Sequence, residues 1–375
     1  MRRSTAALTL VAALASPLDA QWSRVWDQFY LPASHNWYFR NSYRIADRLF
    51  NAFDYGHAIL YETLWTRPGQ ATDQLEVGEY RYVTEELLVR PPRLPLEEMA
   101  IEPHYARLAP EAKAMFEWAH VLHRQAYDVL SDARLSPAAR DAAMAEILAY
   151  YRSRPDLRFS EKPKSMALMQ EQPYSLAFRN GYPKFNGLIW AYHWLQVGLY
   201  EPFLTTADTA EQRRLVVATV GRFFQMLPGG AATMPYVMPM TGAIAPGFAA
   251  RYPEFAIIFD NLHSMHDVIS DILANPAVPR DRKRAEILLA ASRYRDDTTE
   301  VMSRRGWCRM SVMMGLENQG GPSVGFESAL ATPSVERGAV MRHDLEGRMI
   351  GGAHAGHDMP GVEEQCDDRG FKVRS

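Results

Sequence analysis

The segment FDNLHSMHD, residues 259–267, places two histidines and two aspartates inside an otherwise apolar run. It is part of a longer stretch, from Pro253 to Leu273, in which apolar residues recur at the spacing of a helix. Asn275-Pro276 would end that helix, because proline cannot continue it. A charged side chain inside an apolar helix is costly unless it has a partner. The stretch therefore predicts a core helix whose polar residues have a specific partner.

The same helical spacing marks most of the remaining chain. Ser136-Pro137, and Asp208 with Glu211, are typical of helix N-termini. Residues 228–247 are rich in Gly, Pro and Met without a clear period and predict a long ordered loop. Strand-like alternation is nearly absent and no repeat is evident, so the sequence predicts an all-α fold, a compact multi-helix bundle-like domain. Besides the core helix above, we expect helices over residues 37–65, 77–89, 110–131, 136–151, 185–203 and 208–226, and one or two between 279 and 316.

The chain divides into three expected parts. Residues 1–20 combine a basic start, a short apolar run and a small residue before Gln21, which predicts a signal peptide and an exported protein, periplasmic or secreted. Residues 21–320 form the helical domain. Residues 321–375 contain Gly, His and Met without an apolar period and predict a loosely ordered tail. Two cysteines, Cys308 and Cys366, permit one disulfide in an exported chain, but the sequence does not show whether they pair.

Composition excludes several classes of function. Hydrophobic residues make up 47% of the 375 residues and charged residues 23%, as in ordinary globular proteins. The formal net charge is −3 and no long basic run is present, which argues against nucleic acid as a partner. No stretch after the leader approaches the ~20 apolar residues of a membrane span. Without a Gly-rich phosphate loop or a His-Glu-x-x-His motif, nucleotide chemistry and the common zinc-protease mechanism are not expected.

Three acid-x-x-His pairs carry the functional prediction. Residues three apart lie close together on one side of a helix, so an acid and a histidine at this spacing can point into one site. Imidazole together with carboxylate suits iron, zinc or manganese better than calcium or magnesium. We therefore predict a His/carboxylate metal site between helices, with iron the favoured ion. The candidate ligands are Asp54, His57, Glu117, His120, His123, Asp260, His263, His266 and Asp267.

The pair Glu117-x-x-His120 resembles the motif of four-helix di-iron carboxylate proteins, and the two aspartate pairs resemble it with a shorter acid. The resemblance covers these few residues. It implies two further glutamates, for which the candidates are Glu62, Glu85, Glu86 and Glu201.

Redox-active iron at such a site would oxidise a small-molecule substrate, which the sequence does not identify, with O₂ or peroxide. Haem with an axial histidine is a second form of iron cofactor, although no Cys-x-x-Cys-His is present for covalent attachment. Whether the protein is an enzyme stays open.

Two alternatives remain. A non-catalytic copper-binding or copper-handling protein would use soft thioethers and imidazoles in mobile segments. A structural or interaction protein without metal would use the acid-His pairs to satisfy one another. His193, between Trp190 and Trp194, is interpreted as a core histidine or a pocket residue rather than a ligand. The residues that would bind copper are Met226, Met234, Met238, Met240, Met341, His343, Met349, His354, His357 and Met359.

Overall fold

The computed structural model describes residues 25–95, 97–227, 233–325, 330–331, 333, 335–351 and 362–372. The predicted all-α fold is confirmed, since 64% of the structure is helical and strand is almost absent. The predicted signal peptide, residues 1–20, lies outside the described residues. The expected boundary of the helical domain at residue 320 stays a prediction.

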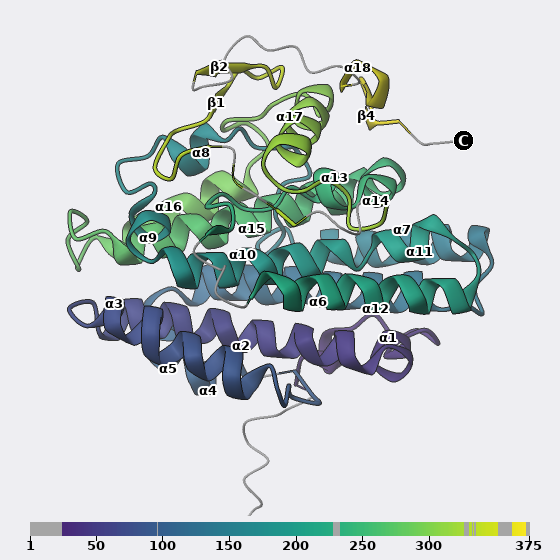
Figure 1. Cartoon of the computed structure of the whole chain (residues 1–375), viewed down its shortest axis with the longest axis horizontal. Coiled ribbons are helices and arrows are strands. Elements are labelled where there is room, and N and C mark those ends of the chain that lie inside the picture. The colour runs from purple at the N-terminus through teal and green to yellow at the C-terminus, as the bar shows by residue number, and fades with distance from the viewer. Residues whose placement is uncertain are drawn as a thin grey trace, which may run out of the picture.

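Four long helices run side by side through the centre of the molecule (Figure 1). The longest stretches of fully buried side chains lie on these helices, so the core is built around them. They are α2 (Arg44–Thr66), α6 (Pro110–Ser131), α10 (Pro183–Gly198) and α15 (Pro253–Ala274). A short helix precedes each of them in the chain: α1 (Tyr38–Ser42), α5 (Pro103–Leu108), α9 (Ala177–Gly181) and α14 (Pro246–Arg251).

The other elements surround this core. The first is the 3-10 helix η2 (Val25–Phe29), and two π-helices, η3 (Gln74–Glu79) and η4 (Tyr82–Leu87), cover most of the predicted helix 77–89. The remaining helices are α3 (Ala71–Asp73), α4 (Glu98–Ile101), α7 (Pro137–Arg152), α8 (Ala167–Gln170), α11 (Glu201–Thr205), α12 (Thr209–Met226), α13 (Thr241–Ile244), α16 (Lys283–Arg295), α17 (Arg304–Glu317) and α18 (Val362–Gln365). Two small antiparallel sheets pair β1 (Arg342–His343) with β2 (Met349–Gly351), and β3 (Cys366–Asp367) with β4 (Gly370–Phe371).

Local sequence explains several helix ends. Ser136 accepts a hydrogen bond from the Ala139 N–H, as expected of an N-cap. Asp208 caps α12 in the same way, but the Glu211 side chain pairs with Arg214, so the capping box is half formed. The expected helix 185–203 is divided into α10 and α11, because Pro202 cannot donate a backbone hydrogen bond to the preceding turn.

The junction between short and long helix is repeated four times. The linking residue has φ near −130° and ψ near 60° in each case: Tyr43 (−125°, 51°), Ala109 (−139°, 63°), Tyr182 (−131°, 60°) and Tyr252 (−129°, 60°). An aromatic residue five positions before each long helix is buried in all four units: Phe39, Tyr105, Phe178 and Phe248.

A carboxylate from another helix caps each short helix. It lies eighteen residues after the first residue of a long helix (44 to 62, 110 to 128, 183 to 201 and 253 to 271), on that helix in three cases and on α11, just after α10, in the case of Glu201. Glu62 accepts from Tyr105 and Asp128 from Phe39, so α2 and α6 cap each other's short helix. Asp271 of α15 accepts from Phe178, and Glu201 of α11, which follows α10, accepts from Phe248. The chain therefore contains four copies of one helical unit, and the expectation that it has no repeat is wrong.

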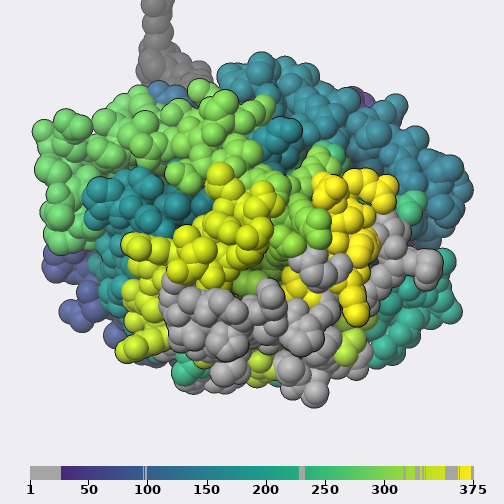
Figure 2. Space-filling view, turned by 90° about the horizontal axis from the view of Figure 1, so that it is seen from above, coloured from purple at the N-terminus to yellow at the C-terminus, as the bar shows by residue number. Residues whose placement is uncertain are grey.

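The C-terminal segments pack on α17. Cys308 of α17 and Cys366 of β3 form a disulfide, and the ring of Trp307 contacts that of Phe371. In Figure 2 the yellow C-terminal residues lie over the face of the molecule that carries α17. The disulfide thus ties β3 to α17.

Replacing both cysteines with alanine is expected to lower the free energy of unfolding by about 2–4 kcal/mol, because the cross-link restricts the unfolded chain. The bridge joins residues separated by 58 positions, so the loop that it closes is long. Urea unfolding of the Cys308→Ala/Cys366→Ala variant beside the wild type measures the loss. Reductant should destabilise the wild type and leave the variant unchanged; a wild type insensitive to complete reduction would contradict this prediction.

Candidate metal centre

Each long helix directs the same two positions toward the centre of the bundle. They lie ten and thirteen residues after the first residue of the helix, and a spacing of three keeps both on one helix face. Histidine occupies six of these eight positions, and all eight side chains are buried. They are Asp54 and His57 on α2, His120 and His123 on α6, His193 and Gln196 on α10, and His263 and His266 on α15.

Three of these histidines form a triad that could hold a metal ion. His57, His193 and His266 each offer a ring nitrogen, and these atoms lie within 4.8 Å of one another. Nε2 of His193 is 3.1 Å from Nδ1 of His266. The surroundings are aromatic: the rings of Phe53 and His57, and those of Phe116 and His266, have centroids 4.1 Å apart. A buried triad of imidazoles in an apolar setting is a site where water does not compete with the protein ligands.

The triad is held in the form that binds metals. Burial, and the neighbouring histidines, hold the pKa of His57, His193 and His266 well below the ordinary value. Each imidazole is therefore neutral at pH 7, with one unprotonated nitrogen, which is the form that binds metals. Both ring nitrogens of His57 are buried without a hydrogen-bond partner, which costs about 1–3 kcal/mol for each such group. A metal ion would satisfy one of them.

The other three histidines adjoin the triad. The ring centroid of His263 is 4.3 Å from that of His193, and the ring of His120 is 5.9 Å from that of His266. The ring of His123 lies 5.8 Å from that of His263. Burial lowers the pKa of His263 to about 3 and also lowers the pKa of His123. The six imidazoles thus form one continuous cluster, and burial lowers the pKa of five of them, His57, His123, His193, His263 and His266.

The predicted carboxylate ligands have other partners. Asp54 binds Arg124 at 2.6 Å and lies 3.9 Å from Nδ1 of His120. Glu117 pairs with Lys113 at 2.7 Å. Asp260 accepts hydrogen bonds from the Thr241 N–H and the Trp307 indole, both at 2.7 Å.

Asp267 lies near Arg179, and its burial raises the pKa of the carboxyl to about 7. The ligand atoms that converge in the triad are therefore imidazole nitrogens alone. Of the glutamates considered for a di-iron site, Glu62 and Glu201 cap short helices, and Glu85 and Glu86 are exposed.

His193 is the member of the triad that sequence reasoning did not select as a ligand. It is 1% exposed, as a core histidine would be, yet it completes the triad. The signal was its position, ten residues after Pro183, which equals that of His120 after Pro110 and of His263 after Pro253.

The methionines considered for copper pack inside the protein. Met226, Met234, Met238 and Met240 are at most 5% exposed, and Met341, Met349 and His343 are also buried. His354, His357 and Met359 lie outside the described residues. The described part of the Met/His segments therefore contributes to the core.

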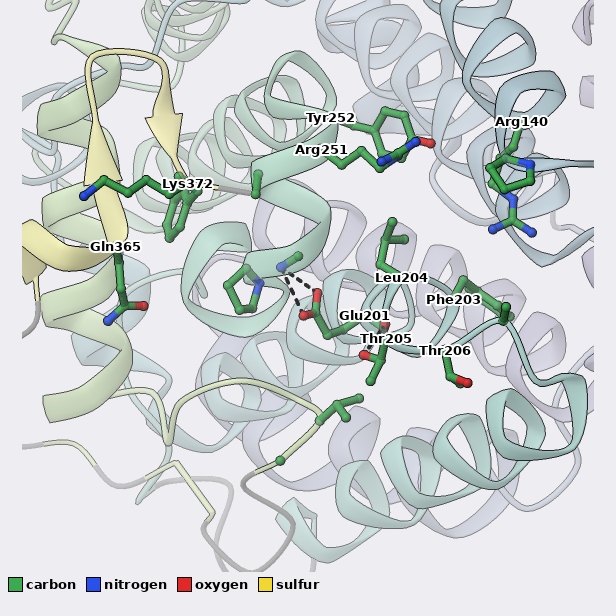
Figure 3. A pocket seen from close by; sticks show the side chains of 18 of the residues that line it. Arg140, Glu201, Phe203, Leu204, Thr205, Thr206, Arg251, Tyr252, Gln365 and Lys372 are labelled. Atoms are coloured by element: carbon green, nitrogen blue, oxygen red, sulfur yellow. Dashed lines mark hydrogen bonds between the residues drawn. The ribbon is translucent and has the colours of Figure 1, made fainter. Parts of the chain in front are cut away.

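The protein has a pocket of about 700 Å³, lined in part by Arg140, Glu201, Arg251, Tyr252 and Lys372 and by none of the six histidines. Figure 3 shows these side chains and the two hydrogen bonds from the Gly247 N–H to Glu201.

Aromatic rings connect this pocket with the histidines. The ring centroid of Phe248 lies 5.8 Å from that of Tyr252 and 4.0 Å from that of Tyr200. The hydroxyl of Tyr200 contacts Nδ1 of His123. The contacts make a continuous path of rings from the pocket to the cluster.

No protein-family model matches the chain, and no curated protein or solved structure is significantly similar to it. Within the described residues, every helix is too short or too polar to span a membrane. The fold and the site define the class: an all-helical protein with a buried histidine triad that could hold a metal ion.

Proposed function

We propose that this chain is an exported metalloprotein that binds a redox-active transition metal at His57, His193 and His266 and oxidises a small molecule with O₂. The observation that carries the proposal is the convergence of three buried imidazole nitrogens within 4.8 Å. A structural protein gains nothing from burying a neutral imidazole such as that of His57 without hydrogen-bond partners, since an apolar side chain would fill the same space at lower cost.

Copper is the ion that we favour. The sequence favours iron because it places carboxylates beside the histidines, but in the structure those carboxylates pair with basic side chains and N–H groups. For a site of imidazoles alone, copper binds more tightly than the other divalent ions of its row. Iron remains the second candidate, supported by the 3.9 Å approach of Asp54 to His120.

Two further observations support redox chemistry outside the cytoplasm. The path of rings from the pocket to His123 offers a route by which electrons pass from a substrate to the metal and then to O₂. The disulfide between Cys308 and Cys366 is of the kind that forms in oxidising compartments, in agreement with the signal peptide expected over residues 1–20.

Elemental analysis of the purified full chain, loaded with Cu(II) or Fe(II) and then desalted, tests the proposal. We expect copper at one or more ions per chain in the wild type and a loss of at least tenfold in affinity in His57→Ala/His266→Ala, because two ligands are removed. His104→Ala is the matched control, since His104 is a partly exposed histidine outside the cluster. Unchanged copper content in the double variant, with folding verified by circular dichroism, would refute the proposed site and direct attention to the Met/His segments.

A further inference from the structure

We infer that the histidine cluster binds two metal ions. The second ion lies beside the triad and is held by His263, His123 and His120. This inference rests on the proposed function and adds a second site to it. The argument comes from ring nitrogens that the triad leaves without partners.

His263 has an unprotonated ring nitrogen, Nδ1, that accepts no hydrogen bond. Its Nε2 lies 2.9 Å from Oε1 of Gln196, an atom that can only accept, so Nε2 carries the proton. In a neutral imidazole the other nitrogen, Nδ1, is then unprotonated. Nδ1 is buried and has no hydrogen-bond partner. A hydrogen bond from one ring nitrogen to a polar side chain is the usual way in which proteins orient a histidine ligand.

His123 is arranged in the same way. Its Nδ1 contacts the hydroxyl of Tyr200, and its Nε2 is buried without a partner. The ring stacks on Phe259, with centroids 3.5 Å apart, which fixes its plane. When Nδ1–H donates to the Tyr200 oxygen, Nε2 of His123 is unprotonated. Its lone pair, like that on Nδ1 of His263, has no protein donor. An ion bound by the triad would leave Nε2 of His123 and Nδ1 of His263 without a partner.

The two sites are neighbours. The ring of His263 is 4.3 Å from that of His193 in the triad, and His120 lies between Asp54 at 3.9 Å and the ring of His266 at 5.9 Å. Within the described residues, the triad is the group whose three ligand nitrogens lie within 4.8 Å of one another. The nitrogens of the second site are farther apart, so at least one imidazole must rotate to bind the second ion. Two ions in adjacent protein sites are commonly about 3.5–4 Å apart, a separation that lets one small molecule such as O₂ bridge them.

Copper titration of the metal-free full chain tests the inference. We expect two Cu(II) per chain in the wild type and in His104→Ala, and one in His123→Ala/His263→Ala, by elemental analysis after equilibrium dialysis. Electron paramagnetic resonance of the wild type is a second test, which does not depend on the folding of a variant. Coupling between adjacent Cu(II) ions should leave a spin count well below the copper content, whereas the variant should give one spin per copper.

The outcomes separate the two proposals. One copper per chain in the wild type, with a full spin count, would overturn the second site and leave the proposed function standing. Two uncoupled coppers that persist in His123→Ala/His263→Ala would place the second ion elsewhere and also overturn the inference. A chain that binds no metal would remove the proposed function itself.

Discussion

Replacing Asp271 with alanine is expected to lower the free energy of unfolding by about 3–5 kcal/mol, because it leaves a buried cation without its partner. Asp271 and Arg179 form an ion pair at 2.6 Å with both side chains 0% exposed. The same carboxylate accepts the backbone N–H groups of Leu176 and Phe178 at the start of α9, so the variant also removes a helix cap. The two losses act at one point of the core and make this one of the most sensitive positions of the chain.

Denaturant unfolding followed by circular dichroism measures the change. Asp271→Asn separates the two contributions, since the amide oxygen still accepts one N–H but carries no charge for Arg179. Asp156→Ala is the control, because its pair with Arg154 is exposed and screened by solvent, and no measurable change is expected there. A loss for Asp271→Ala no larger than that of the control would show that Arg179 finds another partner.

Metal loading is expected to stabilise the fold by about 4 kcal/mol when free copper exceeds its dissociation constant a thousandfold. The ion binds the folded chain, in which the triad nitrogens lie within 4.8 Å, and the unfolded chain does not hold them together. The thermal midpoint should therefore rise by several degrees with added copper and fall after chelation. Scanning calorimetry at several copper concentrations measures this dependence.

The stabilisation should fall in His57→Ala/His266→Ala, where at most the inferred second ion still binds, and persist in full in His104→Ala. Weak copper binding to histidines of the unfolded chain would reduce the effect equally in all variants, so the difference between the two variants is the informative quantity. Equal midpoints for the wild type in chelator and in copper would favour the structural, metal-free interpretation.

Helices follow from local sequence, and here the prediction is close. The apolar spacing predicts a helix over residues 110–131, and α6 spans the same residues; the segment from Pro253 to Leu273 lies within α15. Periodicity is a property of residues three and four apart, so it needs no knowledge of the rest of the chain. The same spacing shows that His120, His263 and His266 lie on core helices.

The composition of the site depends on contacts between helices distant in the chain. His57 and His266 are 209 positions apart in sequence (57 to 266), and nothing local makes their rings meet at 4.2 Å. The carboxylates of two acid-x-x-His pairs bind partners that the sequence does not identify: Asp54 binds Arg124, and Asp260 accepts a hydrogen bond from Trp307.

The sequence by itself determined an all-α fold, the extent of α6 and α15 and the burial of polar groups on them, because helical periodicity acts over one or two turns. The expected helices 37–65 and 185–203 are each divided in two. The tertiary structure alone decided that His193 joins His57 and His266, that the acids are held elsewhere, and that four equivalent units surround the cluster. These features arise from the packing of one helix face on another, and the capping of each short helix by a distant carboxylate sets how those faces meet.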